Sequence, residues 1–167
     1  MHEYSKEQKV DILISALEER YKALHVIRER VQSIGIWALG LLFGAGAWLM
    51  QGDVSLSAFQ KELLVIAAAV MYVAVRYSYL ENLSMGFKKQ QRVAVQLEKA
   101  LGLFTPSMFD DEKESIYPPE WADAGTEQGD GKFFKTTYML LLIGTIFIIV
   151  AVLLSGEHSH HFSHFWY

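Results

Sequence analysis

The residues most able to do chemistry lie at the end of the 167-residue chain, in the segment EHSHHFSHFWY. This segment holds Glu157 and four histidines, His158, His160, His161 and His164. If it is helical, His160 and His164 are one turn apart, as are Glu157 and His161, and either pair could chelate zinc, copper or nickel. The alternative is a compositional bias without a site, with the aromatic residues anchored at a membrane interface. A transition metal at this tail is the one cofactor that the sequence suggests.

Motifs of known enzyme classes do not occur in the rest of the sequence. There is no phosphate-binding loop, no zinc motif and no nucleophile elbow. The chain also has no cysteine, which excludes disulfides and thiolate metal sites. We therefore expect a non-enzymatic protein, with no nucleic acid among its partners.

Three apolar blocks predict an all-α integral membrane protein with three transmembrane helices and long amphipathic cytoplasmic helices. The blocks cover residues 33–50, 63–80 and 138–154. At a rise of 1.5 Å per residue each block is roughly 25–27 Å long, which is close to the hydrocarbon thickness of a bilayer. In lipid the backbone must satisfy its own hydrogen bonds, so each block should be helical. The alternative, a soluble helical bundle, fits poorly because its helices would keep a polar face.

The number of lysines and arginines alternates between high and low in successive segments of the chain. Residues 1–32 contain six of them, residues 51–62 one, residues 76–135 eight, and the residues beyond 154 none. Because cytoplasmic loops carry the excess of basic residues, the N-terminus and the long middle segment should be cytoplasmic and the C-terminus outside. We therefore predict a multi-pass protein of the cell inner (plasma) membrane.

Composition divides the chain into six segments. We assign a cytoplasmic amphipathic helix to 1–32, a transmembrane hairpin to 33–80, a basic amphipathic helix to 81–104, an acidic Pro/Gly linker to 105–135, a third transmembrane helix to 136–155 and a His-rich outer tail to 156–167. The two cytoplasmic helices should lie side by side, because the hairpin brings their membrane ends together. Within the linker, the aromatics of IYPPEW (116–121) either dock on these helices or stay solvated.

Basic residues at the inner end of the second block are candidates for contact with lipid headgroups: Arg76, Lys88, Lys89 and Arg92. Arg76 is the sole charge inside an apolar block, and it lies close enough to the block's end to reach the interface. The other three could bind anionic lipid. Their alternative role is to set the topology.

Small residues in the first block are candidates for helix packing: Gly40, Gly44, Gly46 and Ala47. Gly40 and Gly44 form a G-x-x-x-G pair, which lets two helix backbones approach closely in lipid. The sequence predicts self-association through this surface. The alternative is packing within one chain.

The layout of the sequence resembles the SLATT-type two-span proteins of bacteria. The similar parts are RYKALHVIRERVQ before the first span and RYSYLENLSMGFKKQQRVAVQLEKAL after the second; with the hairpin between them they cover about half of the chain. The third span and the YPPEW linker depart from that layout. The resemblance implies an effector of bacterial antiviral defence that perturbs the membrane after oligomerisation.

We therefore expect a non-enzymatic, homo-oligomeric inner-membrane protein in contact with the lipid bilayer, acting as a membrane-perturbing effector of a bacterial defence system. The alternative is an accessory or scaffold subunit that docks a cytoplasmic protein partner at the membrane. A third hypothesis, metal handling, depends on the His-rich tail alone.

Overall fold

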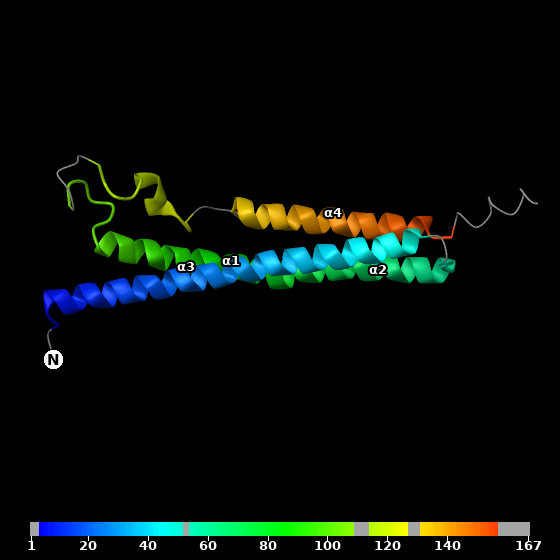
Figure 1. Cartoon of the computed structure of the whole chain (residues 1–167), viewed down its shortest axis with the longest axis horizontal. Helices are drawn as coiled ribbons and strands as arrows, with labels where there is room; N and C mark the ends of the chain where they lie inside the picture. The colour runs from blue at the N-terminus through cyan, green and yellow to red at the C-terminus, as the bar shows by residue number, and fades with distance from the viewer. Residues whose placement is uncertain (1–3, 52–53, 109–113, 127–130, 157–167) are drawn as a thin grey trace, which may run out of the picture. The chain divides into compact units, whose positions relative to one another are not determined.

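The computed structural model describes residues 4–51, 54–108, 114–126 and 131–156. Within these ranges all regular structure is helical, so the all-α prediction is confirmed. The elements are α1 (Lys6–Met50), α2 (Ala58–Val73), the π-helix η1 (Ala74–Leu80), α3 (Glu81–Ala100), the 3₁₀-helix η2 (Pro119–Asp123) and α4 (Lys132–Leu154) (Figure 1).

Three helical stretches of the described chain are long and apolar enough to cross a membrane. The first predicted block, 33–50, forms the second part of α1. The second block, 63–80, forms most of α2 together with η1. The third block lies inside α4, which begins at Lys132, six residues before the block. These lengths and compositions are those of a multi-pass membrane protein.

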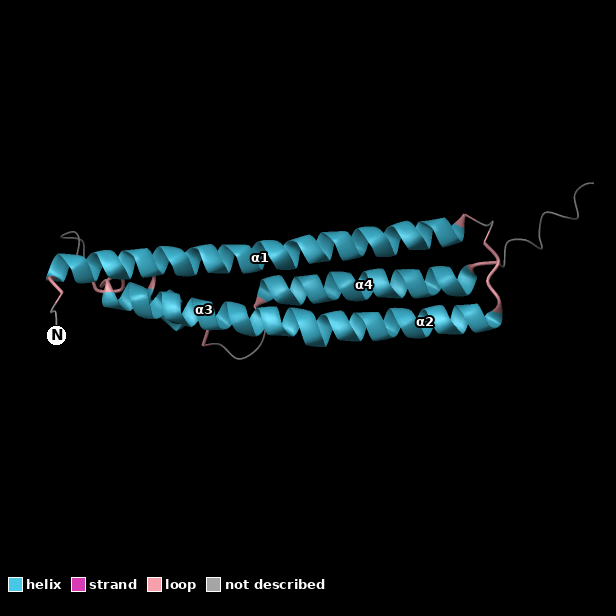
Figure 2. Ribbon diagram, turned by 90° about the horizontal axis from the view of Figure 1, so that it is seen from below, coloured by secondary structure: helices cyan, strands magenta, loops and turns pink. Residues whose placement is uncertain are grey.

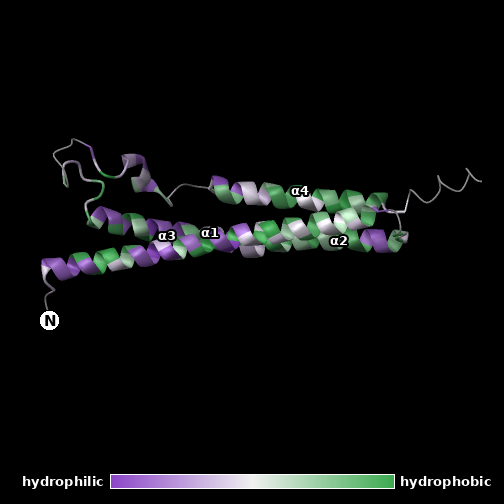
Figure 3. Cartoon of the chain, viewed as in Figure 1, coloured by the Kyte–Doolittle hydropathy of each residue, from purple (hydrophilic) through white to green (hydrophobic). Residues whose placement is uncertain are grey.

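The chain forms two compact units, which we name by their composition. The charged unit is Met1–Arg30 with Leu83–Gly129, and the apolar unit is Val31–Asn82 with Asp130–Tyr167. Helix α1 contributes residues to both units. Figure 3 shows hydrophobic residues concentrated along α2 and α4, and hydrophilic residues along the N-terminal part of α1 and along α3.

Helix α4 holds the apolar unit together. It contains nine buried residues, whereas α2 contains none. In the view of Figure 2, α4 lies between α2 and the second part of α1. A buried cluster of Leu49, Ile148, Ala151 and Val152 joins α1 to α4. The third span is therefore packed against both other spans, a contact that the sequence did not predict.

Local sequence explains where the helix of the second span begins. Ser57 caps α2 by accepting a hydrogen bond from the Gln60 amide at 3.3 Å, while the Gln60 side chain accepts from the Ser57 amide at 2.9 Å. This reciprocal capping box satisfies two amides that have no helical partner. Nearby, Lys61 Nζ donates to the Leu153 carbonyl at 2.9 Å, which places a positive charge at the C-terminal end of α4.

Helix α3 ends four residues earlier than the sequence predicted. Gly102, at φ +79°, follows the helix and closes it: its amide donates to the Lys99 carbonyl, and the Leu103 amide donates to the Glu98 carbonyl. These two bonds form a Schellman motif, which needs a left-handed residue after the helix. The predicted helix of residues 81–104 did not account for this glycine stop signal.

Candidate functional site

Helices α1 and α3 pair through polar contacts in the charged unit. Tyr21 Oη donates to Glu98 Oε1 at 2.6 Å, and Arg20 donates to the Gln90 side-chain oxygen at 2.8 Å. Between these pairs Ala94 and Val95 are buried. The side-by-side arrangement that the sequence predicted for the two helices is therefore present.

The segment around η2 packs against these two helices. The Tyr117 amide donates to the Leu103 carbonyl at 3.1 Å, and the Tyr117 ring meets the Phe104 ring edge-on. Arg92 Nε donates to the Gly125 carbonyl. Of the two alternatives for the aromatic segment IYPPEW, docking is the one that the structure shows.

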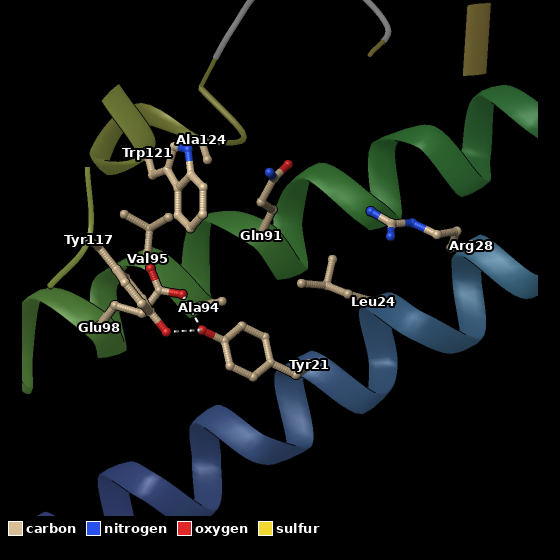
Figure 4. A pocket seen from close by; sticks show the side chains of 10 residues that line it. All are labelled: Tyr21, Leu24, Arg28, Gln91, Ala94, Val95, Glu98, Tyr117, Trp121 and Ala124. Atoms are coloured by element: carbon tan, nitrogen blue, oxygen red, sulfur yellow. Dashed lines mark hydrogen bonds between the residues drawn. The ribbon is translucent and has the colours of Figure 1, made fainter. Parts of the chain in front are cut away.

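A cavity of about 450 Å³ lies between α1, α3 and the η2 segment. Figure 4 shows that side chains from all three surround it. Its lining residues are Tyr21, Leu24, Arg28, Gln91, Ala94, Val95, Glu98, Tyr117, Trp121 and Ala124. The lining combines one buried carboxylate, three aromatic rings and one guanidinium, and these groups together suit a small organic ligand.

The pattern of apolar residues in α3 does not indicate this cavity, because apolar side chains of the helix also lie outside its buried face. Val93, for example, is 40% exposed. The buried face instead carries Ala94, Val95 and Glu98. Only Val95 of these three is strongly hydrophobic, so the face gives a weak hydrophobic signal, although the spacing of three and four residues is that of one helix face.

Tyr21 is the hydrogen-bond donor at the centre of this contact. Partial burial, then the hydrogen bonds to Glu98 and Tyr117, raise the pKa of the Tyr21 phenol well above its ordinary value of 10.0. The phenol therefore stays protonated and continues to donate to Glu98 at alkaline pH.

Replacing Tyr21 by phenylalanine tests this assignment. The change removes the donor to Glu98 and should cost about 1 kcal/mol at pH 8. The pKa of Tyr21 is higher in the folded than in the unfolded protein, so the stabilisation is complete below pH 10.0. It is lost as the pH rises further, because the unfolded phenol ionises first and the unfolded state becomes more favourable. The midpoints of thermal unfolding of the wild-type protein and of Tyr21→Phe should therefore differ at pH 8 and converge above pH 10. A difference that stays constant across this range would contradict the role of the phenol.

Arg76, a predicted headgroup contact, lies in the π-helix η1. Its guanidinium carbon is 3.4 Å from the centroid of the Tyr138 ring and 5.3 Å from that of Tyr77. A guanidinium over an aromatic face is a favourable cation–π contact, especially where water is scarce. Tyr138 on α4 was not singled out by the sequence analysis, because only the fold brings it to Arg76.

The other three predicted headgroup residues lie on α3 in the charged unit. Lys89 and Arg92 are exposed, and Lys88 is half-buried. Arg92 already donates to the Gly125 carbonyl within the chain. Lys89 is thus the exposed lysine of the three.

The small residues of the first span fall on different faces of α1. A Cβ added to Gly46 would lie 2.4 Å from the Phe147 ring of α4, so Gly46 is used for packing within the chain. Gly40 and Gly44 have nothing within 4 Å of an added Cβ, and both are exposed together with Ala47. At 100° per residue this exposed face lies roughly 130° around the helix from Gly46.

The His-rich tail lies outside the described residues, so the four predicted metal ligands have no structural account. Among the residues that the structure does describe, no group of three or more metal-binding side chains is found.

Comparisons of the chain with protein-family models, with curated proteins and with solved structures found no match.

Proposed function

We propose that the chain is a non-enzymatic, homo-oligomeric protein of the inner membrane, in which the exposed face of Gly40, Gly44 and Ala47 packs neighbouring copies together. The charged unit would lie in the cytoplasm and the C-terminus outside. The distribution of lysine and arginine supports this orientation.

The observation that carries the proposal is the difference in surroundings among the glycines of the spans. Gly46 of α1 and Gly144 of α4 lie at contacts within the chain, where an added Cβ would approach Phe147 or Leu42 within 3.0 Å. Gly40 and Gly44 make no such contact. Glycines four residues apart on an exposed transmembrane face favour close approach of a second helix.

The membrane-perturbing role is the more specific part of the proposal. It draws support from the resemblance of the sequence layout to SLATT-type proteins and from the division of the chain into a charged unit and an apolar unit. The three apolar blocks carry a single charge, Arg76, which counts against a constitutively open aqueous pore. Perturbation would therefore require a change in association among the spans.

Substitution of Gly44 by isoleucine tests the proposed interface. The added side chain should block close helix approach and shift the protein to a lower native mass in a mild detergent or nanodisc. Ala45→Ile is the matched control, because Ala45 is exposed on the same helix but points about 100° away. A Gly44→Ile variant with the wild-type mass would contradict the glycine interface.

The alternative is an accessory or scaffold subunit with a protein partner. It is favoured by one observation, the exposure of Ile116 and Trp121 at 55% and 57% in the η2 segment. A wild-type protein that is monomeric in the same mass measurement would overturn self-association and favour this alternative.

A further inference from the structure

Glu98 is an acidic side chain buried in the charged unit without a cationic partner. It is 7% exposed, and its Oε1 accepts the hydrogen bond from Tyr21. In the part of the chain that the structure describes, no lysine or arginine forms an ion pair with it. A buried carboxylate is costly unless a positive charge compensates it. The cavity beside Glu98 is where such a charge could bind.

Aromatic rings surround this end of the cavity. The rings of Tyr117 and Trp121 are 5.7 Å apart and tilted to one another, and the Tyr21 and Tyr117 hydroxyls are 3.4 Å apart. Figure 4 shows the Glu98 carboxylate among these three side chains. Aromatic faces beside a carboxylate form a favourable environment for an organic ammonium group, through cation–π attraction and direct charge pairing.

The opposite end of the cavity carries the opposite charge. Arg28 lines it from α1 and Gln91 from α3. Arg28 is seven residues from Tyr21, and Gln91 is seven residues from Glu98, so each pair spans about 10.5 Å along its helix. Arg28 is exposed, and no described acidic residue forms an ion pair with it. Its guanidinium is suited to binding a carboxylate and would repel a second cation.

We propose that this cavity binds an elongated zwitterion, with the ammonium group held by Glu98, Tyr117 and Trp121 and the acidic group held by Arg28. The ligand class is that of small ω-amino acids, whose charged ends are separated by an apolar chain. Leu24 and Ala94, which lie between the two ends in Figure 4, are apolar and suit such a chain. The site is formed by the charged unit alone, so this inference does not depend on self-association of the spans.

Calorimetric titration of the full chain in nanodiscs, with empty nanodiscs as the blank, tests the proposal. The probes are 4-aminobutanoate, 6-aminohexanoate and 8-aminooctanoate, with hexanoate and 1,6-diaminohexane as matched ligands that carry one kind of charge. One member of the zwitterion series should bind saturably and at least tenfold more tightly than either matched ligand. Absence of saturable binding across the series would overturn the proposal.

Two variants separate the ends of the site. Glu98→Gln keeps the shape of the side chain and should weaken the best zwitterion at least tenfold. Arg28→Gln changes an exposed residue and should remove the preference of the zwitterion over the diamine. Arg30→Gln, the same change on an exposed arginine of α1 outside the cavity, should leave both affinities unchanged. If Glu98→Gln fails to fold, the Arg28 and Arg30 pair decides: equal effects of these two changes would overturn the assignment.

Discussion

Replacing Gly46 by alanine is expected to destabilise the protein by about 1–3 kcal/mol, because one added methyl group overpacks the contact between α1 and α4. Its Cβ would lie 2.4 Å and 2.9 Å from two carbons of the Phe147 ring. That ring is held by the Phe43 ring, with the centroids 4.9 Å apart. The added methyl group must therefore either displace the Phe147 ring from this contact or push the two helices apart. The midpoint of thermal unfolding in detergent should fall accordingly.

Gly86→Ala is the matched control for this substitution. Gly86 also lies inside a helix, but a Cβ there meets nothing within 4 Å. Its replacement should be neutral or should stabilise by up to about 1 kcal/mol, since alanine is the better helix former. Adding Phe147→Leu to Gly46→Ala should recover part of the loss, giving a favourable coupling between the two positions. Equal unfolding midpoints for Gly46→Ala and Gly86→Ala would contradict the tight contact.

Composition and charge predicted the elements of the fold well, because the membrane imposes strong requirements on sequence. A bilayer-long apolar block must be helical. The blocks 33–50, 63–80 and 138–154 accordingly lie in α1, in α2 with η1, and in α4. Apolar residues on every side of a span, however, carry no signal of which face meets a neighbour. The packing of α4 against both other spans could not be inferred for this reason.

The glycines of the first span show the same limit: the sequence does not indicate which of them face a neighbouring helix of the same chain. The G-x-x-x-G spacing marked Gly40 and Gly44, and Gly46 was grouped with them by sequence proximity. In the structure Gly46 faces Phe147, whereas the other two face away from α4. A spacing motif identifies residues that permit close packing, but it does not distinguish packing within a chain from packing between chains.

The cavity of the charged unit could not be predicted from the sequence, for a different reason. Glu98 and Tyr117 follow Tyr21 by 77 and 96 residues, and none of the three belongs to a local motif. Their meeting depends on the pairing of α1 with α3 and on the docking of the η2 segment. The sequence did identify the two helices and the aromatic segment, which are the parts from which the cavity is built.

Replacing Gly125 by alanine should release the η2 segment from α3. Gly125 has a φ of +79°, which costs an L-residue about 1–2 kcal/mol. The added Cβ would also lie 2.8 Å from the Lys88 carbonyl oxygen and 3.1 Å from the Arg92 backbone nitrogen. These are backbone atoms of a helix, so α3 cannot yield, and the segment must move instead. The contact between Arg92 and the Gly125 carbonyl would then be lost as well.

Hydrogen exchange of the Tyr117 amide measures this release directly, because that amide donates to the Leu103 carbonyl when the segment is docked. A local loss of about 3 kcal/mol corresponds to exchange roughly a hundredfold faster. Gly131→Ala is the control: an added Cβ there meets nothing within 4 Å, so exchange at Tyr117 should stay at the wild-type rate. If both variants exchange at that rate, the segment is not held through Gly125. Faster exchange in Gly125→Ala alone would show that Gly125 allows the η2 segment, with the cavity-lining rings of Tyr117 and Trp121, to pack against α3.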